Sequence, residues 1–151
     1  MQLILWRHAQ AEDGKRDLER ELTAKGRRQA IKVAAWLRQR LPEKFELLAS
    51  PATRARQTAE ALRPEVTIAE RLAPGASVSD LLEAVAWPDH GATVTLVVGH
   101  QPTLGRVAAR LLSETEADWS VRKGALWWLE HRLRGGRTEV VVRAVIAPDL
   151  L

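Results

Sequence analysis

The sequence predicts an α/β fold, a three-layer α/β/α sandwich around a mixed sheet that is mainly parallel. Short runs of β-forming residues alternate with amphipathic helical segments over most of the chain, which is typical of parallel strands joined by helices. The C-terminal part instead has two strand-like runs, 125–132 and 139–147, around Arg134-Gly135-Gly136-Arg137, which indicates an antiparallel hairpin. No linker or repeat divides the 151 residues, so we expect a single domain over residues 1–151.

The first elements follow from local patterns. Residues 2–6 form an apolar, β-forming run and predict a short buried strand, and residues 9–21 are polar and predict a loop. Thr23 is a suitable N-cap for a helix that reaches about residue 40, and a second strand is expected over residues 46–49. The apolar residues of that helix recur at helical spacing: Ala30, Val33, Ala34, Leu37 and Leu41.

A second helix is expected directly after residues 46–49. Ser50 is a good N-cap and Pro51 fits the first helical position, so this helix is predicted to start there and to reach about residue 63. Residues 66–69 fit a short strand at an edge of the sheet.

The remaining elements complete the alternation. Ser79 is predicted to cap a short helix, residues 93–98 form the clearest buried strand, and Pro102 is predicted to begin an amphipathic helix. In the C-terminal hairpin, Trp127 and Trp128 are adjacent, so they should face opposite sides of their strand, and one of them should lie in the core.

Composition excludes several classes of protein. The chain has no Cys, which excludes disulfides, thiolate zinc sites and a Cys nucleophile. The four His have no spacing typical of metal ligands, so we expect no metal. No apolar run reaches the roughly 18 residues of a membrane span, and the N-terminus lacks a signal-peptide pattern, so we expect a cytoplasmic protein with no membrane partner. The net charge is +4, but basic and acidic residues are interleaved, so we expect no nucleic-acid partner.

Polar clusters follow three of the predicted strands. Arg7-His8 follows the first strand, residues 50–54 (with Arg54) follow the second, and Gly99-His100 follows the strand over residues 93–98. Because ligands of parallel α/β sheets bind beyond the carboxyl ends of the strands, these clusters are expected to converge. Two Arg and two His suit a phosphate dianion, since guanidinium groups are permanently charged donors and a neutral imidazole can attack a phosphoryl group.

These segments resemble the histidine phosphatase superfamily, also called the phosphoglycerate mutase-like family. Leu5-Trp6-Arg7-His8-Ala9 resembles its Arg-His-Gly/Ala signature, Ser50-Pro51-Ala52-Thr53-Arg54-Ala55-Arg56-Gln57-Thr58 its Ser-Pro-x-x-Arg-Ala-x-Gln-Thr motif, and Val97-Val98-Gly99-His100 its third motif. A segment that begins at Asp17 and continues through Arg20-Glu21-Leu22-Thr23-Ala24-Lys25-Gly26 is similar to the family's entry to its first helix, Arg-Pro-Leu-Thr-x-x-Gly, with Glu21 where Pro is usual. The short length most resembles the small bacterial protein phosphohistidine phosphatases of the SixA type.

The resemblance implies a phosphoglycerate mutase-like fold and a metal-independent phosphatase without a cofactor. His8 would be the nucleophile and would form a transient phosphohistidine. Arg7 and Arg54 would bind phosphoryl oxygens, His100 would stabilise the transition state, and Arg20 would add a phosphate contact. The implied partner is a protein that carries phosphohistidine, and the product is inorganic phosphate.

No motif identifies the acid that protonates the leaving group in larger members of the family. Glu70 lies in the right stretch of the chain, and Glu12 and Asp13 are further candidates. Phosphohistidine needs such an acid less than an ester does, because its imidazole leaving group can be protonated near neutral pH. Two alternatives stay open: a phosphatase of small phosphate esters, such as sugar phosphates, and a non-catalytic module that only binds a phosphorylated partner.

Overall fold

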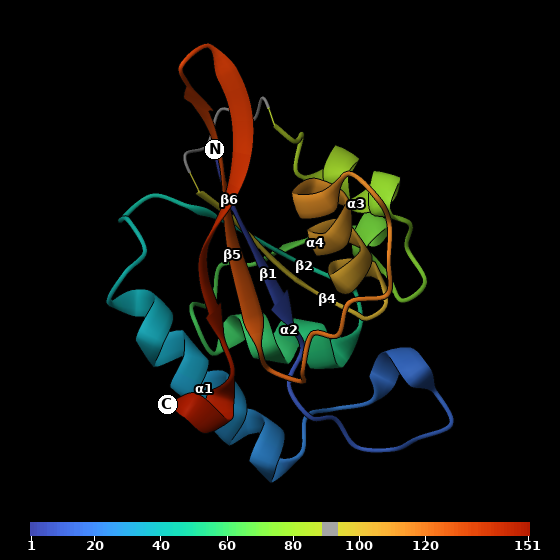
Figure 1. Ribbon diagram of the computed structural model, residues 1–151. Coiled ribbons are helices and arrows are strands. Elements are labelled where there is room, and N and C mark those ends of the chain that lie inside the picture. The colour runs from blue at the N-terminus through green and yellow to red at the C-terminus, as the bar shows by residue number, and fades with distance from the viewer. Residues whose placement is uncertain (89–93) are drawn as a thin grey trace.

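The computed structural model describes residues 1–88 and 94–151, which contain a six-stranded sheet with the order β3-β2-β4-β1-β5-β6 (Figure 1). The first four strands are parallel to their neighbours, β5 is antiparallel to β1, and β6 is antiparallel to β5. The mainly parallel, mixed sheet predicted from the sequence is therefore confirmed. The strands are β1 (Gln2–Arg7), β2 (Glu46–Ala49), β3 (Thr67–Ile68), β4 (Val94–Gly99), β5 (Leu126–Arg134) and β6 (Arg137–Ile146).

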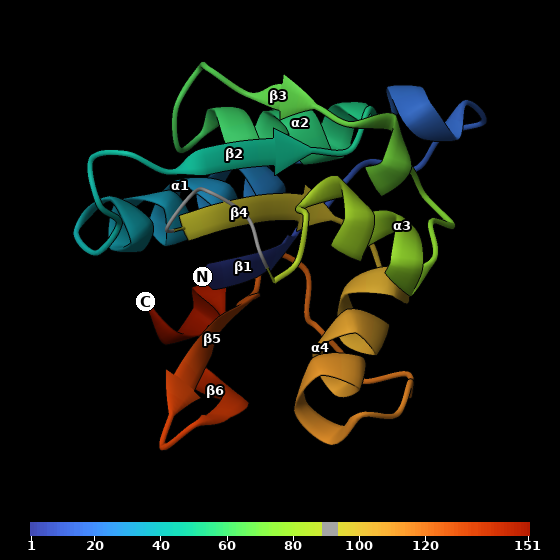
Figure 2. The same ribbon diagram turned by 90° about the horizontal axis from the view of Figure 1, so that it is seen from above.

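Helices cover both faces of the sheet and give the three predicted layers (Figure 2). Helices α1 and α2 pack on one face, and α3 and α4 pack on the other. No helix in the described part of the chain is both long and apolar enough to cross a membrane. The helices are α1 (Ala24–Arg38), α2 (Thr53–Glu60), α3 (Val78–Ala84) and α4 (Thr103–Ser113), with short 3₁₀ helices η1 (Asp17–Glu19), η2 (Glu70–Leu72) and η3 (Pro148–Leu150).

The central strands are buried on both faces. In β1, Ile4 and Trp6 point into the core formed with α1 and α2, whereas Leu3 and Leu5 point into the core formed with α3 and α4. All four side chains are fully buried. Alternate side chains of a strand point to opposite faces, so a strand covered on both sides needs an almost continuous apolar sequence. This requirement explains the apolar runs that precede the polar clusters.

The C-terminal hairpin has the predicted position. Gly135 and Gly136 connect its strands with φ values of +57° and +76°, a left-handed conformation that two-residue hairpin turns require. Trp128 packs edge-on against Trp36 in one core, whereas Trp127 packs beside Trp119 on the other face. The two adjacent Trp therefore face opposite sides of β5, as predicted.

Two predicted helix starts are wrong. The Ser50 amide donates to the Val98 carbonyl at 3.0 Å, so the parallel ladder continues through Ser50, and α2 begins only at Thr53 and ends at Glu60. Helix α3 begins before Ser79, because Ser77 and Asp80 form a reciprocal capping box. Thr93, the first residue of the strand predicted over 93–98, lies outside the described residues.

The predicted start of α1 is correct, and the close approach of its first turn to the Gln10 backbone fixes its position. The Thr23 hydroxyl accepts a hydrogen bond from the Gly26 amide at 2.9 Å, as an N-cap does. The Thr23 amide donates to the Gln10 carbonyl at 3.0 Å. A Cβ at position 26 would lie 1.9 Å from the same carbonyl oxygen, so only glycine fits there.

We expect Gly26→Ala to lower the free energy of unfolding by about 2 kcal/mol, because backbone rather than a flexible side chain must move. Gly14→Ala is the matched control, since the nearest atoms to its new Cβ are side-chain carbons of Arg20, at 3.3 and 3.8 Å. The control should change stability by less than about 1 kcal/mol. Urea unfolding of the three proteins measures both effects, and an unchanged midpoint for Gly26→Ala would contradict this role of the glycine.

Candidate functional site

The carboxyl ends of β1, β4 and β2 lie side by side, and each leads into a polar cluster. Arg7 pairs with Gly99 across β1 and β4, and Ala49 pairs with Val98 across β2 and β4. The ladders continue beyond these pairs, because the His8 amide donates to the Gly99 carbonyl at 3.1 Å. The rings of His8 and His100 consequently lie with their centroids 5.1 Å apart.

His8 is a buried, neutral imidazole with a defined tautomer. Its Nδ1 lies 2.8 Å from the carbonyl oxygen of Ala9. A carbonyl oxygen only accepts, so the ring proton lies on Nδ1 and Nε2 keeps a lone pair. Burial lowers the pKa of His8 to about 4; the Ala9 carbonyl opposes this shift, and the positive charges of Arg54 and Arg7 add to it. At neutral pH the ring can therefore act as a nucleophile through Nε2.

His100 is held by a serine. Its Nε2 lies 2.7 Å from the Ser50 hydroxyl, which also accepts the Ala52 amide at 3.1 Å. When the buried hydroxyl donates to Nε2, both groups are satisfied and the proton of the neutral ring lies on Nδ1. Burial is the main cause that lowers the pKa of His100 to about 3, and electrostatic interactions with His8 and Arg54 contribute to the same shift. A neutral His100 with this tautomer retains Nδ1–H as a hydrogen-bond donor.

Arg54 is a buried cation at the start of α2. Its Nε lies 3.4 Å from His8 Nε2, so the guanidinium adjoins the atom that carries the lone pair. Its two terminal nitrogens donate to Asp17, one to the backbone carbonyl at 2.7 Å and the other to the carboxylate at 3.1 Å. A cation in the first turn of a helix opposes the helix dipole, so this position favours an anionic partner.

Asp17 connects two of the predicted arginines. One carboxylate oxygen accepts from Arg54, and the other accepts from Arg20 at 3.0 and 3.1 Å. Burial alone would raise the pKa of Asp17, but the hydrogen bonds and charges of Arg54 and Arg20 outweigh it and lower the pKa. Asp17 is thus ionised at neutral pH and cannot supply a proton.

The Arg7 guanidinium is held by the segment that precedes β5. One terminal nitrogen donates to the Val121 carbonyl at 2.8 Å, and its buried Nε has no hydrogen-bond partner in the described part of the chain. Burial lowers the pKa of Arg7, but the guanidinium stays charged at neutral pH. The segment 121–125 therefore sets the orientation of this guanidinium.

The motif residues around Arg54 have structural partners. Thr58 accepts the Ala9 amide at 3.1 Å and donates to the Arg54 carbonyl at 2.7 Å, so it ties the residue after His8 to α2. Gln57 accepts the Leu22 amide at 2.8 Å and so fixes the segment that precedes α1. These contacts explain why a Gln-Thr pair suits this point of the motif.

Five of the predicted residues surround one hollow, which we call the His8 cavity. It has a volume of about 330 Å³. Arg7, His8, Arg20, Arg54 and His100 all line it, in agreement with the expected convergence. The complete lining among the described residues is Arg7, His8, Ala11, Asp13, Arg20, Arg54, Pro74, His100, Gln101 and Lys123.

The three candidate acids have different positions. Asp13 lines the His8 cavity. Glu70 is exposed at the start of η2 and is not among the described residues that line the cavity. The Glu12 carbonyl accepts a hydrogen bond from Arg20 at 3.1 Å, but Glu12 does not belong to this lining either.

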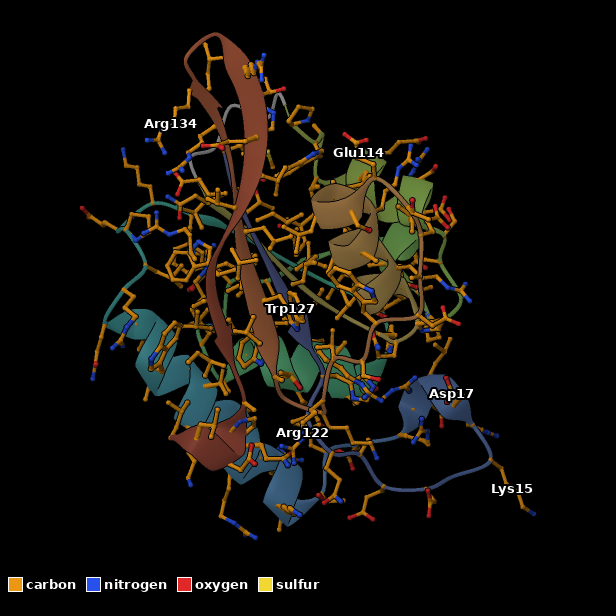
Figure 3. All side chains as sticks on the ribbon, in the orientation of Figure 1. Lys15, Asp17, Glu114, Arg122, Trp127 and Arg134 are labelled. Carbon is orange, nitrogen blue, oxygen red and sulfur yellow. The ribbon has the colours of Figure 1, made fainter. Side chains whose placement is uncertain are left out.

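Sequence patterns do not identify the roles of Asp17, Ser50 and Lys123 in the site. Asp17 precedes Arg20 by one helical turn, a spacing that suggests a local ion pair but not a link to Arg54. The sequence pattern predicts Ser50 as a helix cap, although its hydroxyl contacts His100. Lys123 has no signal, because it reaches the cavity from the distant segment before β5. Figure 3 shows Asp17 and Arg122 at one end of the molecule, far from Arg134 at the hairpin tip.

The chemistry of the cavity suits a phosphoryl group. Three guanidinium groups supply permanent positive charge, and two neutral imidazoles supply a lone pair and a donor. The described residues contain no group of three or more His, Asp or Glu that could hold a metal ion.

Comparison with known proteins identifies the family. Residues 3–74 match the model of the histidine phosphatase superfamily (branch 1). The structure of the protein histidine phosphatase SixA complexed with tungstate has a TM-score of 0.83 and 25% sequence identity over 99% of each chain. The chain belongs to the histidine phosphatase superfamily.

Two further relatives of this histidine phosphatase cover most of its length. Rv1276c of Mycobacterium tuberculosis is 38% identical over 119 residues, which are 76% of this chain and 75% of the relative. A SixA structure from Nakamurella multipartitia has a TM-score of 0.77 and 28% identity, and covers 97% of this chain and 96% of that one. The phosphoglycerate mutase-like fold implied by the sequence motifs is thus confirmed.

The lowered pKa of His8 predicts a loss of stability in acid. Well above pH 6.5 the ring is neutral in both the folded and the unfolded chain. As the pH falls from 6.5 toward about 4, the unfolded chain binds a proton that the folded chain does not, so the free energy of unfolding decreases. For His8 alone the loss between pH 7 and about pH 4.5 is roughly 2 kcal/mol.

His8→Gln should remove this contribution. Urea unfolding at both pH values should therefore show a smaller acid destabilisation in the variant than in the wild type. The same pH dependence in both proteins would show that the folded state does not hold His8 neutral.

Ser50→Ala should reduce kcat about tenfold, because His100 loses the partner that fixes its tautomer and orientation. The ¹⁵N chemical shifts of His100 should move from a single Nδ1–H tautomer toward a mixture. Ser50→Thr keeps the hydroxyl and is expected to restore the wild-type shifts and most of the activity. Wild-type kcat and unchanged shifts in Ser50→Ala would contradict a positioning role.

Proposed function

We propose that this phosphatase removes phosphate from phosphohistidine in proteins, through a phosphohistidine intermediate on His8. The observation that supports it best is the geometry of His8, whose Nδ1 donates to Ala9 while Nε2 lies beside Arg54 in the His8 cavity. A buried neutral ring with a fixed tautomer presents its lone pair without prior loss of a proton. The names of the SixA structures support the substrate class.

The first step transfers the phosphoryl group to His8. The Nε2 lone pair attacks phosphorus, a new N–P bond forms, and the N–P bond of the substrate breaks. The substrate imidazole, protonated on its other nitrogen, leaves as a neutral ring. Arg7, Arg54 and Arg20 neutralise the charge of the phosphoryl oxygens, and His100 donates one hydrogen bond.

The second step frees the enzyme. Water attacks the phosphorus of phospho-His8, and the N–P bond breaks with its electron pair returning to Nε2. The protons of the water remain with the product, inorganic phosphate. Arg54 and Arg20 are both paired with Asp17, so the phosphoryl group competes with this carboxylate for the two guanidinium groups.

The acidic residues of the site favour an N–P substrate. An alkoxide leaving group requires a positioned acid, which contributes about 10²–10⁴-fold to the rate. Asp17 is kept ionised by its two arginines, and Glu70 is exposed outside the described lining of the cavity. A protonated imidazole leaving group makes no such demand.

One observation favours the hydrolysis of small phosphate esters as a second candidate function. Asp13 lines the His8 cavity and is the one candidate acid from the sequence that does so in the described structure. If Asp13 protonates an alkoxide, Asp13→Asn would abolish hydrolysis of alkyl phosphates and leave phosphohistidine hydrolysis intact.

Phosphate release in the presence of a chelator tests both candidates. The substrates are a carrier protein with phosphohistidine, glycerol phosphate as the alkyl ester and p-nitrophenyl phosphate, whose leaving group needs no acid. We expect rapid release from the carrier protein and slow release from glycerol phosphate, with a loss of at least about 10³-fold in His8→Ala. Rapid release from glycerol phosphate, lost in Asp13→Asn, would instead support the ester phosphatase. No release from any substrate would contradict both.

A further inference from the structure

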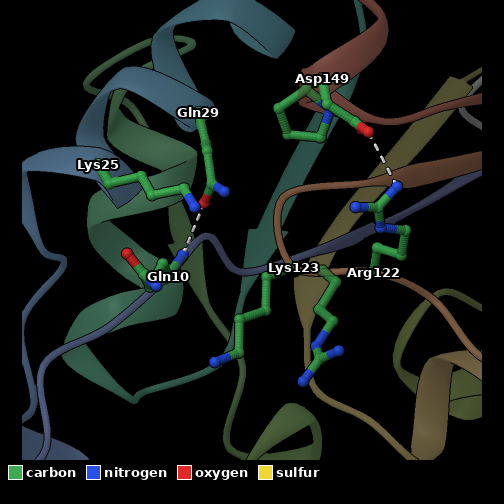
Figure 4. Close-up of a pocket in the computed structure, with 8 residues that line it drawn as sticks. Gln10, Lys25, Gln29, Arg122, Lys123 and Asp149 are labelled. Carbon is green, nitrogen blue, oxygen red and sulfur yellow. Dashed lines mark hydrogen bonds and ion pairs between the residues drawn. The ribbon is translucent and has the colours of Figure 1, made fainter.

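A second hollow adjoins the His8 cavity. This hollow, the Lys25 groove, has a volume of about 410 Å³, and Arg7 and Lys123 line both spaces. Figure 4 shows Lys25 and Gln29 on α1 at one side, with Arg122 and Lys123 on the segment before β5 at the other. A substrate whose phosphoryl group contacts Arg7 can therefore extend into this groove.

The backbone on both sides of the groove is fixed. Lys25 precedes Gly26, which packs directly against the Gln10 carbonyl. Lys123 precedes Gly124, which has a φ of +75° and whose amide donates to the His8 carbonyl at 3.1 Å. The Gly124 carbonyl accepts from the Trp6 indole at 2.9 Å, and a Cβ on Gly124 would meet Pro148 at 2.8 Å. The two lysines thus extend from rigid positions.

The groove is lined by more positive than negative charge. Asp149 is paired with Arg122 at 2.9 Å. Lys25 and Lys123, in contrast, have no carboxylate within ion-pair distance in residues 1–88 and 94–151. Two ammonium groups and the guanidinium of Arg7 remain to attract an anion.

The polar neutral groups of the groove are also donors. Gln29 uses its carbonyl oxygen to accept the Gln10 amide at 3.0 Å, so its NH₂ group is left to donate. The Gln10 side-chain carbonyl accepts from the Thr23 hydroxyl at 2.9 Å, which leaves its NH₂ group to donate as well. A carboxylate or a phosphate accepts hydrogen bonds only, so it matches this set of donors.

We propose that the Lys25 groove binds a second anionic group of the substrate, a carboxylate or phosphate on the molecule whose phosphoryl group His8 attacks. This inference rests on the proposed function of the His8 cavity. The second anionic group comes either from an acidic side chain near the phosphohistidine of a protein or from a second acidic group of a small phosphorylated molecule. In both cases Lys25 and Lys123 determine specificity, because they distinguish substrates that share the same reacting group.

Two pairs of matched substrates test the proposal and separate its sources. The first pair is a phosphohistidine peptide with Glu or with Gln on both sides of the phosphohistidine. The second pair is carboxyphenyl phosphate and phenyl phosphate. We expect the acidic member of at least one pair to have a kcat/KM about three- to tenfold higher, mainly through a lower KM. The pair that shows the preference identifies the source of the anion.

Lys25→Gln should reduce this preference to less than about twofold. Lys44→Gln removes the same charge from the loop between α1 and β2 and should keep the wild-type preference. No preference in either pair, or a preference that Lys25→Gln leaves unchanged, would overturn the proposal.

Binding to His8→Ala separates this result from a failure of the proposed function. Calorimetry with the same four compounds measures affinity without turnover. If the wild type hydrolyses neither phosphohistidine peptide, the proposed function fails. The groove proposal is then supported when His8→Ala prefers an acidic compound and His8→Ala/Lys25→Gln does not, and it is overturned when the members of each pair bind equally.

Discussion

The parallel pairing of β4 with β1 on one side and β2 on the other holds the site together. Each of these strands is apolar and buried, and each ends in a polar cluster. Because the three strands are parallel and in register, their carboxyl ends lie side by side, and His8, Ser50 and His100 follow these ends. The amides of His8 and Ser50 still donate to β4 carbonyls, which extends the rigidity of the sheet to the reacting groups.

The electrostatics follow from this burial. A ring removed from water and surrounded by guanidinium groups resists protonation, so His8 and His100 stay neutral while the arginines remain charged. Asp17 balances part of that charge by pairing with Arg54 and Arg20. The cavity therefore combines a free lone pair with strong attraction for anions, a combination that a solvated His–Arg pair would not provide.

Sequence patterns predicted much of the fold and the five motif residues of the cavity, because these depend on local periodicity and on short motifs. The apolar run of β1, the cap at Thr23 and the glycine turn of the hairpin are all decided by neighbouring residues.

The role of Ser50 could not be predicted in the same way. A serine hydroxyl suits a helix cap as well as a hydrogen bond to a distant ring, and only the β2–β4 pairing selects the hydrogen bond to His100. Asp17 could be linked to Arg20 by spacing, but its contact with Arg54 requires the tertiary fold. The Val121 carbonyl that binds Arg7 and the Lys123 side chain that lines the cavity come from a segment distant in the sequence, which no local pattern indicates.

His8 Nδ1 donates its proton to the Ala9 carbonyl, so the phosphohistidine intermediate that we propose forms on the other ring nitrogen, Nε2. Rapid mixing of the phosphatase with a phosphohistidine carrier protein, an alkaline quench and NMR of the phosphorylated peptide would locate the phosphoryl group. We predict that it lies on Nε2 of His8. A phosphoryl group on Nδ1 of His8, or on any other residue, would contradict the account.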